Sequence, residues 1–342
     1  PATGELLWSF TEPNTPRYEY SMRKGYGKGV AYGEIDGRGV VYIVTPGFFL
    51  HALDAETGLP LEDWGEAVPI DGFPASGSVD LVADLIEGWG PWENLNQTYD
   101  PYVGMPLEIG YITNSSPPIV VNDVVIVGNS AQQGYNQTRQ EMVPGDILAY
   151  DARTGKQKWK FHVIPRPGEF GHETWPQDSD SWALGGGGVW LLGTVDPELG
   201  LVYFSTGNPA PMFGGEIREG DNLFTASVLA LDVETGERRW HYQVVRHDVW
   251  DADIATPLLL YETEVDGAPR KALAAMRADG YLFLFDRETG EPLSPIEERA
   301  VPQDEYQRTA PTQPFPVGVE SILPDCSFWR DRVPPPFELN CS

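Results

Sequence analysis

The sequence predicts an all-β protein built as a β-propeller. An apolar strand followed by Asp-x-x-Thr-Gly recurs along the chain, and Trp often stands four residues after the Gly. The five copies lie near residues 2–8, 50–64, 147–159, 228–240 and 283–290, the first reduced to Ala-Thr-Gly. Recurring strand units of this kind are typical of sheets arranged around an axis. The four intervals between copies predict about four blades plus partial pieces.

Within each copy, Asp-x-x-Thr-Gly predicts the turn of a β-hairpin. The Asp carboxylate can accept hydrogen bonds from turn amides, and Gly supplies a position with positive φ. Trp8, Trp159 and Trp240 stand in register and are suited to packing between neighbouring blades. Strands between the repeats are expected at 39–44, 118–128 and 199–208, the second of these turning as a hairpin at Asn122-Asp123.

Composition favours a large folded body and excludes some partners. Hydrophobic residues make up 41% of the 342 residues, which is ample for a core. The chain carries 51 acidic and 23 basic side chains, a net charge of −28, so it repels phosphate backbones and anionic lipid headgroups. Nucleic acid is therefore not expected as a partner. No apolar run reaches about 18 residues, and the start at Pro1 indicates a removed leader or a cut chain.

The last segment, residues 292–342, is rich in Pro, and we expect a connection without a strand there. It holds both cysteines, Cys326 and Cys341, without the CxxC spacing of a zinc or redox site. A disulfide between them is an option in an oxidising compartment. The whole chain, 1–342, is interpreted as one partial propeller domain.

Several phrases of this sequence resemble the pyrroloquinoline quinone (PQQ)-dependent alcohol and glucose dehydrogenases, the quinoproteins. They include LHALDAETG, STGNPAP, RHDVWDAD and DRETGEPLSPIEERAVPQ, and the likeness is greatest to the glucose-dehydrogenase-like branch. The resemblance implies a periplasmic eight-bladed propeller that oxidises a small alcohol or sugar. It also implies a respiratory quinone or a cytochrome as electron acceptor. Against this pattern the chain is expected to be a fragment without the opening blade and the C-terminal half.

The strongest match is RHDVWDAD at residues 246–253. The family pattern His-Asp-x-Trp-Asp places the catalytic base at its second acid, which here is Asp251. Oxidising an alcohol requires a base for the hydroxyl proton while hydride leaves carbon, and a carboxylate can serve. The alternative is that Asp248, Asp251 and Asp253 are turn residues at a blade edge.

The resemblance also implies calcium beside the cofactor. Asn208, in STGNPAP, falls where the family ligates the metal through an amide oxygen. The family's acidic ligand is replaced by Gln132 or Gln133, which should weaken calcium binding because an amide carries no charge. Trp190 falls at the position of the tryptophan that stacks on the quinone, and a core tryptophan is the alternative.

Four more residues match cofactor-contacting positions with less specificity. Lys28 stands where Arg is common, and Ser115 and Ser130 align with hydroxyl groups that bind cofactor carboxylates. Arg277 lies one position away from the expected basic residue, where Ala278 stands, and strand register makes such a shift costly.

Two rival functions remain open on the sequence. One is a non-catalytic propeller that serves as a protein-assembly scaffold, since similar repeats occur in such proteins. The other is a degenerate enzyme that has lost metal binding through Gln132 and Gln133. A scaffold has no need of Asp251, Asn208 and Trp190 at the family spacing, which favours the dehydrogenase.

Overall fold

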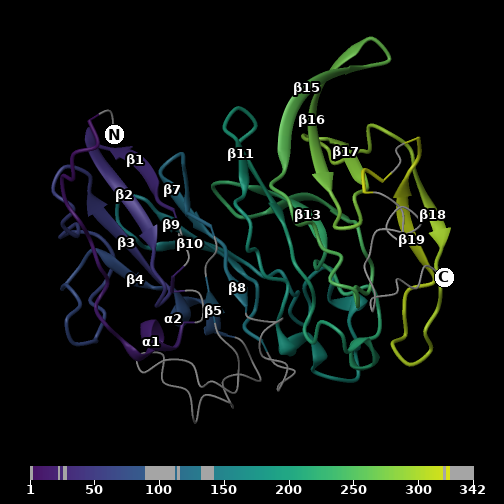
Figure 1. Ribbon diagram of the computed structural model, residues 1–342, viewed down its shortest axis with the longest axis horizontal. Helices are drawn as coiled ribbons and strands as arrows, with labels where there is room; N and C mark the ends of the chain where they lie inside the picture. Colours follow the sequence, from purple (N-terminus) through teal and green to yellow (C-terminus); the bar gives the residue numbers. More distant parts are fainter. Residues whose placement is uncertain are drawn as a thin grey trace, which may run out of the picture.

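The computed structural model describes residues 3–21, 24–25, 29–88, 112–113, 116–131, 142–318 and 321–323. Antiparallel sheets follow one another around the molecule in chain order, from β1–β4 (purple) to β18 and β19 (yellow) in Figure 1. The predicted all-β propeller architecture is therefore confirmed.

Three of the sheets in the described part of the chain have four strands. The first contains β1 (Ala31–Ile35), β2 (Arg38–Val44), β3 (Phe49–Asp54) and β4 (Ser78–Asp80), in that order. The second has the order β10 (Gln157–Phe161), β9 (Ile147–Asp151), β7 (Val124–Val127) and β6 (Ile119–Val121). The third runs β11 (Thr194–Asp196), β12 (Leu201–Ser205), β13 (Ser227–Asp232) and β14 (Arg238–Gln243).

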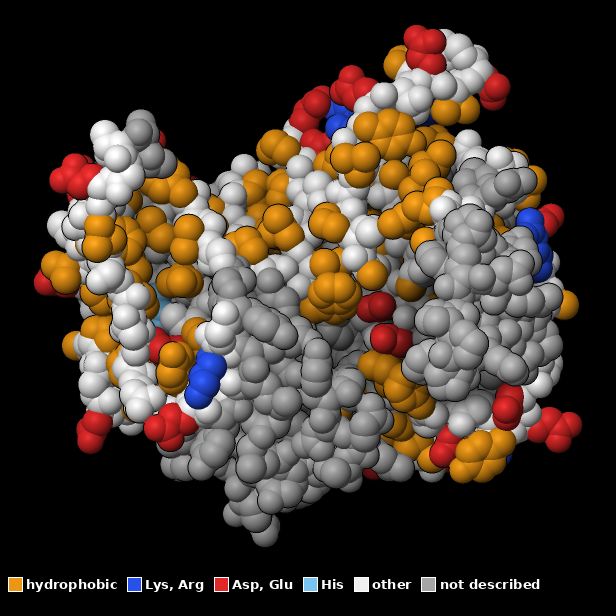
Figure 2. Space-filling model, viewed as in Figure 1, with side chains coloured by type: hydrophobic (Ala, Val, Ile, Leu, Met, Phe, Trp, Pro, Cys, Tyr) orange, Lys and Arg blue, Asp and Glu red, His pale blue; other side chains and the backbone are white. Residues whose placement is uncertain are grey.

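The described residues also form three smaller sheets. A three-stranded sheet contains β15 (Leu259–Val265), β16 (Ala268–Met276) and β17 (Leu282–Asp286). The pairs are β18 (Ile296–Ala300) with β19 (Thr312–Pro316), and β5 (Ile112–Thr113) with β8 (Ser130–Ala131). The β15–β16 hairpin projects from the body, and acidic side chains gather near its tip (Figures 1 and 2).

In the described part of the chain the helices are short and lie in the connections. They include the α-helices α1 (Pro16–Tyr20) and α2 (Leu81–Ile86). They also include the 3₁₀ turns η3 (His172–Thr174), η4 (Ser181–Leu184) and η5 (Gly215–Ile217). Among the described residues, no helix has the length and apolar character needed to cross a bilayer.

The hydrophobic core is divided into layers between successive sheets. Along β12, Leu201 and Tyr203 pack toward the β15–β17 sheet, whereas Val202 and Phe204 pack toward the β6–β10 sheet. This alternation follows from the two-residue period of a strand. Because both faces are covered, every residue of the strand LVYFS is buried, including the polar Ser205 at its end.

The tryptophans of the repeats join neighbouring blades, as predicted. Trp159 lies against Gly236 of the next repeat, and a Cβ atom added to that glycine would be 2.5 Å from Cδ2 of the indole. The Trp159 Nε1–H donates to the carbonyl oxygen of Val233 at 3.0 Å. Trp8 and Trp240 repeat this arrangement with Gly58 and Gly290. Each of these Trp side chains thus packs against the turn of the next repeat and donates a hydrogen bond to it.

Trp64 takes the same role although the spacing did not predict it. It stands six residues after Gly58 instead of four, yet its Nε1–H donates to the carbonyl oxygen of Ala152 at 3.0 Å. Its indole lies against Gly155 of the following repeat. The two extra residues conceal this tryptophan from a search at fixed spacing.

The turns behave as the sequence indicates. In the third repeat, one carboxylate oxygen of Asp151 accepts from the backbone N–H groups of Arg153 and Thr154 and from the Thr154 hydroxyl. The predicted hairpin of β6 and β7 turns at Asn122 and Asp123, whose φ angles are 47° and 60°. These angles suit Asn and Asp, which tolerate the left-handed region better than other non-glycine residues.

The expectation that residues 292–342 hold no strand was wrong. β18 and β19 pair antiparallel, with Ile296 opposite Pro316 and Glu298 opposite Pro314. Pro314 and Pro316 are two residues apart, so both missing N–H groups fall on the same edge of β19. A strand at the edge of a small sheet tolerates this arrangement. Cys326 and Cys341 lie outside the described residues.

Candidate active site

The segment RHDVWDAD connects β14 to β15 as an irregular loop. Asp248 is fully buried and shapes it: one carboxylate oxygen accepts from the Trp250 N–H at 2.9 Å and the other from the Ala252 N–H at 3.0 Å. Burial raises the pKa of this carboxyl, against the opposing effect of these bonds. Asp248 is thus the turn-forming residue that the alternative interpretation expected.

Two polar side chains anchor this loop from outside. Asn208, which follows β12, donates from Nδ2 to Oδ2 of Asp248 at 2.8 Å. Arg218 donates from Nη2 to the Asp248 carbonyl oxygen at 2.6 Å and from Nη1 to Oδ1 of Asn222 at 2.7 Å. Burial lowers the pKa of Arg218 to about 10, although the charge of Asp248 acts in the opposite direction. The loop is therefore held by buried charge-assisted bonds.

His247 is a positioning residue of the same loop. Its ring nitrogens lie 2.8 Å from the carbonyl oxygen of Gly220 and 2.7 Å from that of Gln307. Burial and the nearby Arg218 charge lower the pKa of the imidazole, although both carbonyl contacts favour its charged form. A neutral ring donates to only one carbonyl oxygen at a time.

Trp190 and Asp253 meet on the other side of the loop. The Trp190 Nε1–H donates to Oδ2 of Asp253 at 3.1 Å, which brings together residues 63 positions apart. Asp253 is 6% exposed, and burial raises its pKa to about 7. The charges of Asp251 and Asp248 also raise this pKa, whereas the bond from Trp190 lowers it.

Gly207 allows the backbone to approach this pair closely. A Cβ atom there would lie 3.0 Å from the Gly188 carbonyl oxygen and 3.3 Å from Oδ2 of Asp253. It would also lie 3.6 Å from Cδ1 of Trp190. The backbone of Gly207, directly before Asn208, therefore lies beside Trp190 and Asp253.

Asp251, the predicted base, differs from Asp248 and Asp253 in being exposed. Its φ is 60°, a conformation that Asp tolerates better than bulkier side chains. In the chain, Asp251 follows Trp250, which is 48% exposed, and stands two residues before Asp253, the buried partner of Trp190. On the face in Figure 2, acidic side chains lie in a hollow beside hydrophobic ones.

Of the remaining predicted residues, Ser130 and Arg277 are described in the structure, and Arg277 lines a cavity together with Trp250 and Ala252 of the loop. Ser130 is buried in β8, opposite Thr113 of β5. Arg277 follows β16 and is 2% exposed, and its guanidinium binds Asp279 and the carbonyl oxygens of Val244 and Pro314. The predicted residues outside the described part are Lys28, Ser115, Gln132 and Gln133.

Asp253 was not selected from the sequence, yet it is central in the structure. The available signal was a second acid two residues after the predicted base. The Asn208 amide and the carboxylates of Asp251 and Asp253 are oxygen donors of the kind a hard cation prefers. Within the described residues, however, no three His, Cys, Asp or Glu side chains are arranged as a complete metal site. The described residues therefore supply some of the oxygen ligands that a cation needs, and Trp190 supplies an aromatic ring for a planar cofactor.

The fold and these residues define a β-propeller that gathers carboxylate, amide and indole groups on the connections between its strands. The chain belongs to the family described as "PQQ: Glucose/ethanol/alcohol dehydrogenase, beta-propeller domain", whose family model matches residues 1–328. Family membership agrees with the resemblance seen in RHDVWDAD and STGNPAP.

Similar proteins carry names from the same family. A quinohemoprotein alcohol dehydrogenase of Comamonas testosteroni is 30% identical over 97% of this chain and 47% of its own length. ADH IIB of Pseudomonas putida is 36% identical over 68% of this chain and 32% of its own length. The glycerol dehydrogenase large subunit of Gluconobacter oxydans is 34% identical over 71% of this chain and 32% of its own length. The chain thus spans less than half of the length of these relatives.

Solved structures agree on the fold. The crystal structure of the Comamonas testosteroni enzyme superposes with a TM-score of 0.64 at 27% identity, covering 93% of this chain and 42% of that one. A europium-containing methanol dehydrogenase gives a TM-score of 0.62 at 25% identity, with coverages of 84% and 44%.

Proposed function

We propose that this protein takes part in PQQ-dependent oxidation of an alcohol or an aldose sugar, with Asp251 as the general base. One observation carries the proposal. Two side-chain hydrogen bonds, Trp190 to Asp253 and Asn208 to Asp248, join three separate segments at the loop that holds Asp251. Family membership supports the cofactor, and the relatives' names support alcohols and sugars as substrates.

The surroundings of each residue indicate its proposed role. Exposed Asp251 accepts the hydroxyl proton as the substrate is oxidised. Trp190, half-buried and fixed by Asp253, offers an indole face for a planar ring. Buried Asp248 holds the loop so that Asp251 keeps its position. When bound, the quinone supplies a hydride acceptor and the cation supplies positive charge beside it.

Calcium is the cation we propose, with Asn208 and Asp253 as ligands, joined by Gln132 or Gln133. Cofactor contacts would come from Lys28, Ser115, Ser130 and Arg277. The Gln residues supply oxygen without charge, so the carboxylate of Asp253 becomes the more important ligand. The likeness to a structure described as europium-containing makes Eu³⁺ a useful comparison in metal titrations.

The electron acceptor and the location are also part of the proposal. A relative named methanol dehydrogenase [cytochrome c] subunit 1, from Methylorubrum extorquens, supports a cytochrome, and a respiratory quinone is the alternative. We place the protein in the periplasm. The high negative charge is compatible with either acceptor.

The test uses the protein expressed from its complete gene, with PQQ and either Ca²⁺ or Eu³⁺. Quinone binding is followed by absorbance and fluorescence, and turnover by dye reduction with ethanol or glucose. We expect Asp251→Asn to lower kcat about 10²- to 10⁴-fold with quinone binding retained. Asp266→Asn is the matched control, because Asp266 is also an exposed Asp with positive φ (53°) but lies in the β15–β16 turn.

The possible results distinguish the dehydrogenase from the scaffold and from the degenerate enzyme. Failure of the folded chain to bind quinone in the presence of either metal would contradict the cofactor assignment and favour a scaffold. Quinone binding that needs no metal would favour a degenerate site. Full activity in the Asp251→Asn protein would remove Asp251 as the base.

A further inference from the structure

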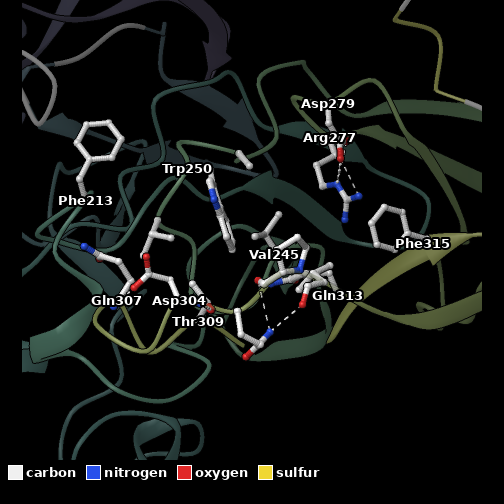
Figure 3. Close-up of a pocket in the computed structure, with 15 residues that line it drawn as sticks. Phe213, Val245, Trp250, Arg277, Asp279, Asp304, Gln307, Thr309, Gln313 and Phe315 are labelled. Atoms are coloured by element: carbon white, nitrogen blue, oxygen red, sulfur yellow. Dashed lines mark hydrogen bonds and ion pairs between the residues drawn. The ribbon is translucent and has the colours of Figure 1, made fainter. Parts of the chain in front are cut away.

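A cavity of about 750 Å³ opens beside the RHDVWDAD loop. Its second wall is the segment 301–315, which includes β19 and the connection before it. Figure 3 shows Trp250 between Asp304 and Gln307 on one side and Arg277, Asp279 and Phe315 on the other. This volume lies within the range of sites for drug-sized ligands and far exceeds what a two-carbon alcohol fills.

The two walls are bonded to each other, so the cavity is preformed. The Arg246 N–H donates to Oε1 of Gln313 at 2.9 Å, and Nε2 of Gln313 donates to the Arg246 carbonyl oxygen at 2.8 Å. The carbonyl oxygen of Gln307 lies 2.7 Å from Nε2 of His247. Gln307 and Gln313 therefore hold the segment against the loop that carries Asp251.

The lining combines aromatic faces with hydrogen-bonding side chains. Trp250 and Phe213 are 48% and 50% exposed, and each presents a ring to the cavity. Asp304 uses Oδ1 to accept the Gln307 N–H, and Gln307 uses Oε1 to accept the Gly215 N–H. These bonds fix the two side chains and involve neither Oδ2 of Asp304 nor the Gln307 side-chain nitrogen.

The charge of the lining indicates a neutral ligand. Arg277 is the one cation among the lining residues, and it is already paired with Asp279 at 2.8 Å. Asp304 adds a further negative charge. The lining thus offers no unpaired positive charge to an anionic ligand, whereas a molecule rich in hydroxyl groups could stack on a ring and donate to carboxylate oxygens.

The cavity is also next to the proposed base. Trp250 and Ala252 both line it, and Asp251 lies between them in the chain. We infer that the cavity is a subsite for a polyhydroxylated substrate of hexose size, in which Trp250 stacks on the sugar and Asp304 and Gln307 bind its hydroxyl groups. The role as a substrate subsite rests on the proposed function, although binding itself can be measured separately.

Binding is tested first, on the protein expressed from its complete gene and kept free of cofactor, by saturation-transfer NMR with D-glucose as the probe. We expect saturation transfer in the wild type, weakened about tenfold in affinity by Trp250→Ala and about threefold by Asp304→Asn. Matched controls are Tyr306→Ala and Glu305→Gln, because both residues are exposed, adjacent in sequence and absent from the lining. Trp250→Phe keeps a ring and should lose less affinity than Trp250→Ala.

Specificity is tested second, on protein loaded with quinone and metal. The ratio of kcat/KM for glucose to that for ethanol should fall in Trp250→Ala and Asp304→Asn, chiefly through KM, and stay constant in the two controls. Glucose that binds all six proteins equally, or none of them, overturns the subsite. Glucose binding without turnover of any substrate would instead retain a polyol site and reject the proposed oxidation.

Discussion

The repeats and the RHDVWDAD loop are held together by different kinds of interaction. In the repeats, each Asp-x-x-Thr-Gly turn bonds to itself, and one Trp joins it to the neighbouring blade. In the loop, buried Asp248 depends on Asn208 and Arg218, which stand 40 and 30 residues away. The comparison teaches that the blades form from one set of contacts repeated in successive units, whereas the site depends on contacts that occur once and need several blades already in place.

The largest expected effect comes from removing a blade tryptophan. Trp159→Ala should lower the free energy of unfolding by about 3 to 5 kcal/mol, because it leaves a cavity against Gly236 and an unpaired Val233 carbonyl. Trp250→Ala, the same change in the loop at a half-exposed position, should cost far less. Urea unfolding measures both. Equal losses would show that the two regions do not differ as we describe.

A smaller loss is expected from the loop's buried carboxylate. Asp248→Asn replaces an acceptor shared by Asn208 and two backbone amides, and should cost about 2 to 3 kcal/mol. Asp251→Asn, three residues away and exposed, should leave stability nearly unchanged. If Asp251→Asn proves the more destabilising of the two, Asp248 does not anchor the loop. Thermal and urea unfolding of both variants provide the measurement.

The smallest effect concerns a buried histidine inside a blade. His51 in β3 lies 2.8 Å from Ser78 Oγ and 3.4 Å from Thr45 Oγ1, and burial lowers its pKa to about 3. The unfolded chain therefore binds the extra proton below its ordinary pKa near 6.5, and stability falls as the pH falls through that value toward 3. Between pH 7 and pH 5 this group should cost about 2 kcal/mol.

The matched variant His51→Gln isolates this contribution. It should be less stable than the wild type at pH 7 but lose less between pH 7 and pH 5, as measured by urea unfolding. Burial raises the pKa of the nearby Glu12 in both proteins, which acts in the opposite direction and cancels in the comparison. An identical pH dependence in the two proteins would contradict the role of His51.

Some structural features escaped prediction for identifiable reasons. Trp64 was hidden by two additional residues in its repeat, although the contact it makes is the same. β19 was hidden by Pro314 and Pro316, which discourage a strand unless both fall on its unpaired edge. The cavity between the loop and residues 301–315 has no sequence pattern, because its shape results from bonds between the two segments.

The sequence by itself determined the repeated blades, their turns and the segment that carries the proposed base. The turns depend on interactions within a few residues, and each Trp makes the same contact with the following repeat, so the recurring pattern of Asp, Gly and Trp records both. Only the tertiary structure separated three acids that look alike in RHDVWDAD: Asp248 is buried as an anchor, Asp253 is bonded to Trp190, and Asp251 is exposed. Burial and long-range partners decide those roles, and neither is written in local spacing.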